Sequence, residues 1–446
     1  MKVVLIAMSG LRAYNEELTR LGMTLPGLMD RGRIIAALPS LSLLTLAGMT
    51  PYRVDVEYHE VEDLRKLETL PACDLAAFST FTARAKDAYE LSARYRAAGV
   101  TTVVGGLHAT ALPEEAMRHF DSVVVGEGEP SWPRLLADFE AGRLQPLYRS
   151  NGVEFSLADA PMPRFDLLDI DMYNRLTVQT QRGCPWRCEF CASSITLTPH
   201  VKTKPVDRVI AEIRAIKAMR PHAFIEFADD NTFANKPHAR ELMRALSDER
   251  VRWFTETDLS VADDEELLSS MRDAGCSQVL IGLESPTALG LDGLELRQNW
   301  KRRRLDGYMA SIARIQSHGI SVNGCFILGL DGDGPEVFDS IWDFVERSGL
   351  QEVQITVMTA FPGTPLYSRL RTEGRLIDET GWEKCTLFDV NFKPNRMSVT
   401  DLEHGLVELG RRLYSEEAKL ERNHRFGRQF KQGLARRREE RRSHVC

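Results

Sequence analysis

The sequence predicts an α/β protein with two successive domains: a doubly wound parallel sheet, then a partial six-stranded TIM-type barrel. Short apolar runs alternate with helical stretches along most of the chain, as parallel strands and their connecting helices do. A proline-punctuated stretch at about 143–174 interrupts this alternation once. We therefore predict a first domain at 1–142, a linker at 143–174, a barrel at 175–368 and a helical C-terminal extension at 369–446, and 446 residues are enough for both cores.

The first domain contains five predicted strands, several of them valine-rich and almost continuously apolar. Such runs are typical of parallel strands that are buried on both faces. Ligands of open parallel sheets bind at the carboxyl ends of the strands, where glycines are found here. The strands are predicted at 3–7, 54–59, 75–79, 102–105 and 122–125, the helices at 83–98 and 130–141, and the glycines are Gly105, Gly106, Gly126 and Gly128.

The second domain repeats the strand–helix unit six times. A full eight-fold barrel needs about 250 residues, so six repeats predict an incomplete one, with its active site at the carboxyl ends of the strands. The strands are predicted at 176–181, 223–227, 251–255, 278–282, 322–328 and 353–358, and the helices at 206–219, 238–247, 263–274, 305–318 and 335–348.

The C-terminal extension is predicted to be helical and ends in a basic tail. One amphipathic helix is predicted at 401–414, with Thr400 as its N-cap. Residues 419–442 contain ten Lys and Arg against three Glu, although the whole chain has a net charge of −7. Three interpretations of this tail stay open: a solvated helix folded against the acidic body, peripheral contact with a membrane surface, and nucleic-acid binding.

The bulk composition is that of an ordinary globular protein, with 43% hydrophobic and 27% charged residues. No apolar run approaches the roughly 20 residues that span a bilayer, so no integral membrane span is expected. The short apolar run at 1–7 fits a buried first strand better than a signal peptide. We therefore expect a cytoplasmic protein.

Three of the eight cysteines lie in one loop, directly after the first strand of the barrel. Cys184, Cys188 and Cys191 have the spacing C-x3-C-x2-C, with which three thiolates can hold three corners of a cubane iron–sulfur cluster and leave one iron open. A structural zinc site is the alternative, but it normally takes four ligands in two separated pairs, and only the isolated His200 follows. Disulfides are not expected in a long chain without an export signal.

The cysteine loop, with Phe190 before its last cysteine, resembles the cluster loop of radical S-adenosylmethionine (SAM) enzymes. Four further elements resemble this superfamily at the expected strand ends. They are F-A-D-D-N-T-F at 227–233, G-L-E-S at 282–285, G-C-F-I-L-G-L at 324–330 and F-P-G-T-P-L-Y at 361–367.

The resemblance implies a [4Fe–4S] cluster that binds SAM and cleaves it with one electron to a 5′-deoxyadenosyl radical. That radical abstracts hydrogen from an unactivated carbon, and the chemistry is oxygen-sensitive. The implied partners are a small-molecule substrate and an electron donor such as flavodoxin or ferredoxin. The implied cluster ligands are the three cysteines, and the implied SAM-binding residues are Phe190, Asp229, Asp230, Glu284, Ser285, Ile327, Leu328, Gly329 and Pro362.

The first domain resembles that of the cobalamin-binding subgroup of the superfamily, class B methyltransferases included. The subgroup pattern is D-x-H-x-x-G, then S-x-L, then G-G. The first part is missing, because residues 8–15 read M-S-G-L-R-A-Y-N, so no histidine is offered to cobalt from below. Plain turn chemistry is the alternative explanation of the remaining residues. The implied cobalamin-binding residues are Ser79, Thr80, Phe81, Gly105, Gly106, Leu107, Gly126, Glu127 and Gly128.

This subgroup resemblance implies cobalamin-dependent methylation of an unactivated carbon in a small-molecule substrate, such as a natural product, isoprenoid or tetrapyrrole. Residues 382–397 resemble the C-terminal extension of members that act on isoprenoids and tetrapyrroles. One alternative is a radical rearrangement, cyclisation or other C–H functionalisation in which cobalamin carries no methyl group or is absent. An alternative of another class is a redox sensor. Nucleic-acid substrates are disfavoured, because the tRNA-modifying branch has three further cysteines where this chain has only Cys73.

Overall fold

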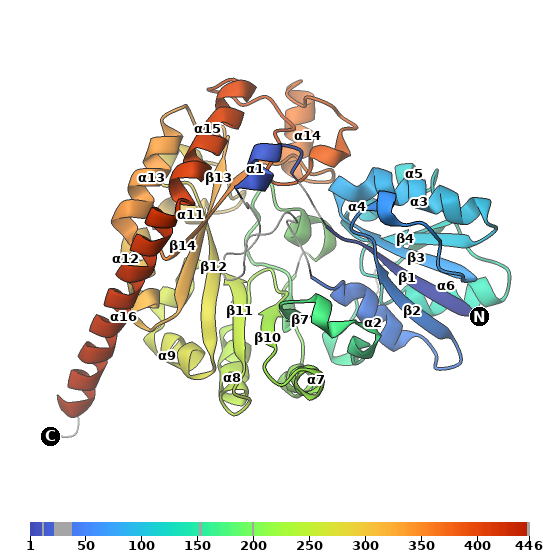
Figure 1. Ribbon diagram of the computed structural model, residues 1–446, viewed down its shortest axis with the longest axis horizontal. Helices are drawn as coiled ribbons and strands as arrows, with labels where there is room; N and C mark the ends of the chain where they lie inside the picture. Colours follow the sequence, from blue (N-terminus) through green and yellow to red (C-terminus); the bar gives the residue numbers. More distant parts are fainter. Residues whose placement is uncertain (11–12, 22–37, 151–153, 199, 444–446) are drawn as a thin grey trace.

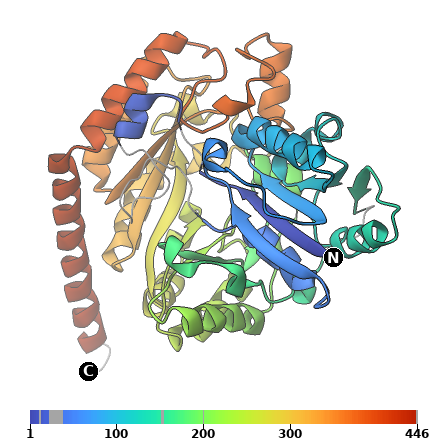
Figure 2. The same ribbon diagram turned by 45° about the vertical axis from the view of Figure 1, so that its right-hand side comes forward.

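The computed structural model contains two parallel six-stranded sheets side by side, with the C-terminal helices packed along the second (Figures 1 and 2). It describes residues 1–446 except 11–12, 22–37, 151–153, 199 and 444–446. The α/β class predicted from the alternation of strands and helices is confirmed. Among the described residues, no helix is long and apolar enough to cross a membrane.

The first sheet has the strand order β2-β1-β3-β4-β5-β6, and all of its pairs are parallel. Separate apolar cores cover its two faces, which explains the nearly continuous apolar runs in its strands. All five predicted strands are present. The strands are β1 (Lys2–Met8), β2 (Asp55–Glu60), β3 (Leu75–Thr80), β4 (Thr101–Gly105), β5 (Ser122–Val125) and β6 (Leu147–Arg149).

Helices α3 (Ala85–Ala97) and α6 (Trp132–Glu140) confirm the two helices predicted in the first domain. The sequence did not predict the sixth strand or helix α2 (Leu41–Met49). Strand β6 has only three residues, too few to show a periodicity, and it adds part of the predicted linker to the first sheet. Helix α2 is short, but it packs near β1 and supplies part of a cavity described below.

The second sheet has the strand order β14-β13-β12-β11-β10-β7, again with parallel pairs throughout. Strands β14 and β7 stand at opposite ends of this order, so the barrel is open, as six repeats predict. The strands are β7 (Leu176–Val178), β10 (Phe224–Phe227), β11 (Arg252–Thr257), β12 (Cys276–Glu284), β13 (Ser321–Leu328) and β14 (Glu352–Val357).

The predicted first barrel strand at 176–181 is divided in two. Strand β7 joins the barrel, whereas β8 (Gln181–Arg182) turns away and pairs with β9 (Lys202–Thr203) in an antiparallel hairpin. The cysteine loop lies inside this hairpin. Its two ends are therefore fixed by backbone hydrogen bonds.

The five helices predicted around the barrel are present and cover the outside of the sheet (Figure 1). Two short helices after β12, α10 (Ala288–Leu291) and α11 (Trp300–Arg304), were not predicted, because one or two helical turns show no period. The five predicted helices are α7 (Val206–Met219), α8 (Lys236–Ser247), α9 (Glu265–Asp273), α12 (Tyr308–Ser317) and α13 (Val337–Ser348).

The extension contains α15 (Val399–Leu413), and the predicted cap at Thr400 is wrong. Ser398 is the N-cap: its hydroxyl accepts from the Asp401 amide at 3.0 Å, and Asp401 accepts in return from the Ser398 amide. This reciprocal capping box gives a hydrogen-bond acceptor to two backbone amides that have no partner within the helix. Thr400 lies inside the first turn and cannot form this pair of contacts.

The basic tail forms helix α16 (Glu416–Ser443), whose far end runs past the body (Figure 1). Arg422 is buried and donates to the Leu413 carbonyl at 2.8 Å, and Arg425 pairs with Glu346 at 2.6 Å. Arg428 and Lys431 are exposed. These four basic residues, which recur every three residues, therefore do not share one solvent face, because Arg422 and Arg425 bind the helix to the body.

Candidate active site

Two cavities lie at the carboxyl ends of the two sheets and share a wall. The first has a volume of about 460 Å³ and opens over β1, β3, β4 and β5. The second, of about 490 Å³, lies inside the barrel. Asp230 and Leu38 line both cavities. Groups bound in the two cavities would therefore face each other across Asp230.

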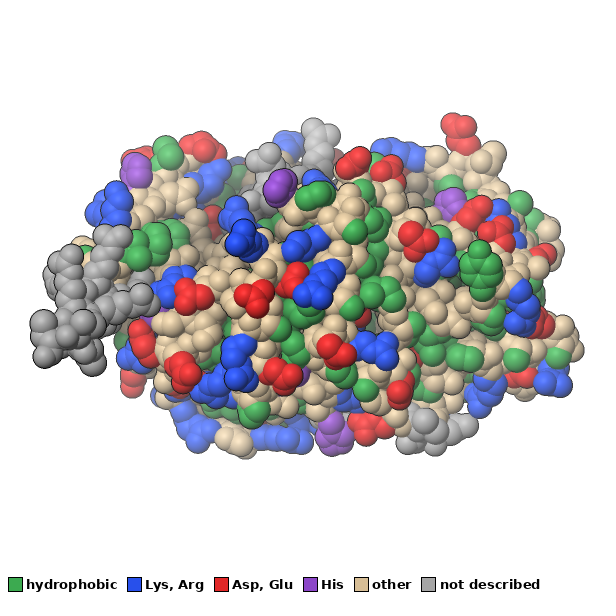
Figure 3. Space-filling view, turned by 90° about the horizontal axis from the view of Figure 1, so that it is seen from below, with side chains coloured by type: hydrophobic (Ala, Val, Ile, Leu, Met, Phe, Trp, Pro, Cys, Tyr) green, Lys and Arg blue, Asp and Glu red, His purple; other side chains and the backbone are tan. Residues whose placement is uncertain are grey.

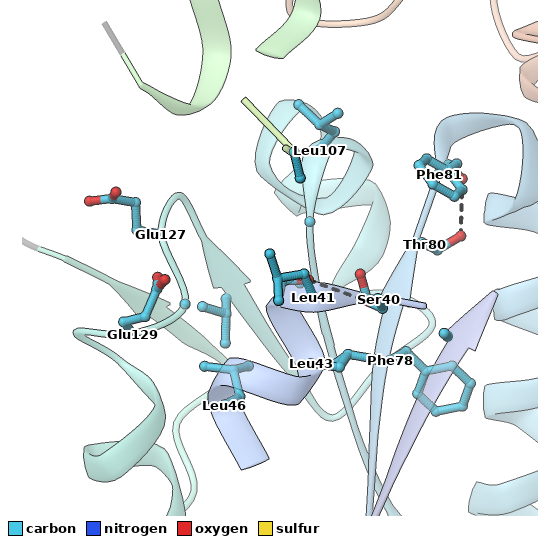
Figure 4. A pocket seen from close by; sticks show the side chains of 18 of the residues that line it. Ser40, Leu41, Leu43, Leu46, Phe78, Thr80, Phe81, Leu107, Glu127 and Glu129 are labelled. Carbon is cyan, nitrogen blue, oxygen red and sulfur yellow. Dashed lines mark hydrogen bonds between the residues drawn. The ribbon is translucent and has the colours of Figure 1, made fainter. Parts of the chain in front are cut away.

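All nine residues predicted to bind cobalamin line the first cavity. Figure 4 shows the apolar side chains of Leu41, Leu43 and Leu107 around its interior, with Glu127 and Glu129 on one side. Gly106 has φ of +103°, and a Cβ there would lie 3.4 Å from the Thr80 carbonyl oxygen. Bare backbone thus borders a broad apolar space, which fits a large flat cofactor that approaches the chain closely.

No histidine lines this cavity among the residues that the structure describes. The loop after β1 contributes Met8 and Ser9, although residues 11–12 of the predicted departure from the cobalamin pattern lie outside the described residues. The expectation that no imidazole is offered to a corrinoid here stays a prediction. The described residues of the lining would hold a bound corrinoid by backbone and apolar contacts.

An ion-pair network joins the first domain to the barrel at the edge of the first cavity. Arg182 contacts Glu127 at 2.7 Å and Glu129 at 2.8 Å, and Lys202 contacts Glu127 at 2.9 Å. Burial opposes ionisation of Glu127, yet Lys202 and Arg182 lower its pKa below the ordinary value. Arg182 directly precedes the cysteine loop, and this position is the one sequence signal that could have identified it.

The three cysteines of the loop line the second cavity together, and none forms a disulfide. Burial raises the pKa of Cys184 to about 11 and that of Cys188 to about 12, and it also raises the pKa of Cys191. The protein alone therefore keeps these thiols protonated, and a metal cluster would bind with proton release. Three soft donors that converge on one cavity fit an iron–sulfur cluster.

The zinc alternative receives no support from the described part of the chain. No group of three or more Cys, His, Asp or Glu there is arranged to hold a single metal ion. The loop supplies three cysteines, one fewer than the four ligands that a structural zinc site normally takes.

The paired aspartates Asp229 and Asp230, predicted together as SAM-binding residues, have different surroundings. Asp229 is 4% exposed and accepts hydrogen bonds from the Thr180 and Gln181 amides at 2.8 and 3.0 Å. Asp230 accepts from the Gly183 amide at 2.8 Å and lines both cavities. Asp229 thus fixes the turn into the cysteine loop, whereas Asp230 is open to a ligand.

Glu284 lines the second cavity and forms an ion pair with Lys301 of α11, which also donates to the Gly282 carbonyl at 2.7 Å. Burial alone would lower the pKa of Lys301, but the Glu284 carboxylate raises it well above its usual range. Glu284 has a φ of +62°, in the left-handed region that costs a non-glycine residue about 1 kcal/mol or more. The end of β12 thus holds a strained, charge-compensated carboxylate in the cavity.

The other predicted SAM-binding residues divide into two groups. Phe190 and Ile327 line the second cavity. Ser285, Leu328 and Gly329 lie at the ends of β12 and β13, and Pro362 lies in the loop after β14. None of the four is among the described residues that line the cavity.

Glu256 is a cavity residue that the sequence analysis missed. Its side chain is exposed to the second cavity. Burial, followed by repulsion from Glu226, raises the pKa of Glu256 to about 8. Glu226 itself pairs with Arg175, whereas Glu256 has no counter-ion among the described residues. Alternation of charged and apolar residues in β10 and β11 was the available signal.

Comparisons with known proteins agree with this geometry. Residues 178–345 match the radical SAM superfamily, residues 38–136 match the B12 binding domain, and residues 364–445 match a domain of unknown function, DUF4070. Bacteriochlorophyllide d C-12(1)-methyltransferase of Chlorobaculum tepidum is 27% identical over 408 residues, which cover 89% of this chain and 86% of that protein. Hopanoid C-2 methylase of Rhodopseudomonas palustris is 26% identical and covers 78% of this chain and 67% of its own length.

A solved structure has the same fold over most of its length. The radical SAM methyltransferase TsrM from Kitasatospora setae, with tryptophan and a SAM analogue bound, superposes with a TM-score of 0.63 at 15% identity. The match covers 83% of this chain and 76% of TsrM.

The chain is a radical SAM enzyme, defined by the cysteine loop and the barrel around it. More narrowly, it belongs to the subgroup that carries an N-terminal B12-binding domain. Its cofactors are accordingly a [4Fe–4S] cluster, SAM and cobalamin. The resemblance seen in the sequence identified both the radical SAM superfamily and its cobalamin-binding subgroup correctly.

Proposed function

We propose that the protein methylates an unactivated carbon of a largely apolar, ring-containing small molecule, with tetrapyrroles and isoprenoids as the leading substrate classes. The observation that carries this proposal is the shared wall: Asp230 and Leu38 line both the cobalamin-side cavity and the cluster-side cavity. A methyl group held in one cavity and a substrate carbon held in the other can meet only where the two cavities adjoin.

The bound cofactors supply one-electron cleavage of SAM, hydrogen abstraction from the substrate and a methyl group for transfer. The protein residues hold these groups in place. Cys184, Cys188 and Cys191 hold the cluster, and Asp230 and Glu284 offer carboxylates to the SAM ammonium, a charge-assisted contact. Glycine-bordered backbone at the ends of β4 and β5, with the end of β3, would hold the corrinoid.

The lining of the barrel cavity supports an apolar substrate. Next to the cysteines it presents large apolar side chains on several strands and loops, whereas its charged side chains are mostly paired with one another. The named activities of the two relatives above, on a bacteriochlorophyllide and a hopanoid, agree with such a substrate. The apolar residues include Trp186, Phe190, Leu280, Ile327, Met358, Phe361 and Leu387.

The test is an anaerobic assay of the reconstituted protein with cobalamin, a reductant and SAM that carries an isotope-labelled methyl group. Bacteriochlorophyllide d and a hopanoid are offered in separate reactions, and products are analysed by mass spectrometry. We expect 5′-deoxyadenosine together with a product that carries the label. Deoxyadenosine with an unlabelled, cyclised or rearranged product would contradict methylation and favour the alternative radical outcome.

A further inference from the structure

The outer side of the cysteine loop is covered by the segment that leads into helix α11. The Leu296 amide donates to the Arg187 carbonyl at 2.9 Å, and the Glu189 amide donates to the Leu294 carbonyl at 3.0 Å. Trp186 of the loop stacks on Trp300 of α11 with ring centroids 4.5 Å apart. The loop that holds the cluster and this segment therefore form one surface unit.

This unit exposes a group of basic side chains around one apolar residue, which we call the cluster-loop patch. It consists of Arg187, Leu296, Arg297, Arg302 and Arg303. Leu296 is 49% exposed, and Arg297, Arg302 and Arg303 are exposed.

Little in the described structure neutralises this patch. The side chains of Arg187, Arg297 and Arg302 form no hydrogen bond or ion pair with described residues. Arg303 contacts only the amide oxygen of Gln298, at 2.9 Å.

The neighbouring charges do not cancel the patch. Lys301 forms an ion pair with Glu284, and Arg304 forms one with Asp263. Buried Glu295 accepts hydrogen bonds from backbone amides. The exposed acids of the same segment are Asp292, which accepts from Asn299, and Asp306.

The charge of the patch is opposite to that of the chain as a whole, which is −7. By contrast, the underside of the molecule shows Lys and Arg interspersed with Asp and Glu (Figure 3). A local excess of arginine around one exposed leucine is typical of a transient interface with an acidic protein, where charge steers the encounter. The position of the patch on the cluster loop indicates which acidic protein that would be.

We propose that the cluster-loop patch is the docking surface for an acidic electron-carrier protein of low potential, of the flavodoxin kind. This inference rests on the proposed function, because an enzyme that cleaves SAM reductively needs one electron from outside for each cleavage. The carrier loses that electron and the cluster gains it, and no bond forms or breaks in the step. Docking on the loop shortens the path between the two redox centres.

Binding of reduced flavodoxin to the reconstituted enzyme tests the proposal, measured by biolayer interferometry over a range of salt concentrations. The test variant is R297E/R302E, and R297Q/R302Q removes the charge without reversing it. The control is R118E/R244E, which makes the same change at exposed arginines of the first domain and of α8. We expect the Kd at low ionic strength to rise about tenfold or more for the reversal, less for the neutral pair, and not at all for the control.

Measuring SAM cleavage with two electron donors distinguishes an effect on carrier docking from an effect on the cleavage reaction itself. With flavodoxin as the donor, R297E/R302E should produce less 5′-deoxyadenosine than the wild type, and with dithionite it should equal the wild type. Unchanged flavodoxin affinity and salt dependence in R297E/R302E would overturn the docking site. Loss of binding to an RNA duplex or an anionic vesicle, with flavodoxin binding intact, would assign the patch to another partner and also overturn the proposal. Failure of dithionite-driven cleavage in the wild type would instead refute the proposed function.

Discussion

The two cavities differ in the kind of contact that they offer a ligand. The first is bordered by apolar side chains and bare backbone, and its two carboxylates are neutralised by Arg182 and Lys202 at the domain boundary. The second contains the three thiols of the cysteine loop, a buried ion pair and a carboxyl without a counter-ion among the described residues. Cobalamin is large, so its cavity must match its shape and let the backbone approach closely. The cluster and SAM are charged, so their cavity must supply charged groups at fixed positions. A substitution in one cavity should therefore weaken binding of the cofactor held there and leave binding of the other cofactor unchanged.

The largest effect is expected from the cluster ligands. Each of the variants Cys184→Ala, Cys188→Ala and Cys191→Ala should lose the cluster and all SAM cleavage, because three thiolates are the minimum set here. Cys73→Ala is the matched control in the first domain. Iron and sulfide content, deoxyadenosine release and corrinoid binding report the outcome. Retained SAM cleavage in any of the three would remove that cysteine from the ligand set.

Lys301→Met should be the most destabilising change among the buried charges of the second cavity. It leaves Glu284 buried without its counter-ion, which typically costs on the order of 3 kcal/mol of unfolding free energy. Denaturant unfolding of the cluster-free protein measures this. The double variant Glu284→Gln/Lys301→Met should recover part of the loss, because no charge is then stranded. No recovery would mean that Lys301 acts through packing alone.

Gly106→Ala should damage the first cavity alone. A side chain at a φ of +103° is strained by about 1–2 kcal/mol, and its Cβ narrows the approach to the Thr80 backbone. Corrinoid affinity should fall while iron content stays at the wild-type level. Gly99→Ala is a suitable control, since it has a φ of +78° but open space around the added Cβ. Equal loss of corrinoid affinity in both variants would attribute the effect to strain elsewhere.

The smallest and most specific effect concerns Glu256. The unfolded chain releases this proton near its ordinary pKa of 4.5, whereas the folded protein holds it until about pH 8. The folded state thus binds the extra proton between these values, so the wild type loses stability as pH rises through this window. Glu256→Gln has no such proton, and its Tm advantage should grow from pH 5 to pH 8 and then level off. A Tm difference that does not change with pH would place Glu256 in a solvated position.

The sequence located the first cavity better than the second for a physical reason. Ser79, Gly105 and Gly126 follow apolar strands, and in a parallel sheet such positions meet at one edge. Each can therefore be identified from local pattern alone.

In the sequence, Arg182, Glu256 and Lys301 cannot be distinguished from ordinary surface charges. Only their positions in the folded barrel identify them as residues of the site. The same limit applies to Asp229 and Asp230. They are adjacent and chemically identical, and only tertiary contacts show that one fixes a turn while the other faces both cavities.

The central claim is that the two cavities operate as one site. The most direct test incubates the reconstituted protein anaerobically with reduced cobalamin and methyl-labelled SAM, without substrate, and then recovers the bound corrinoid. The account predicts that the label is recovered with the corrinoid in the wild type. The Cys188→Ala variant should retain the corrinoid without label, because SAM loses its anchor on the cluster, and Gly106→Ala should retain less corrinoid. A wild-type protein that retains no corrinoid, or retains it without acquiring label, would contradict the account.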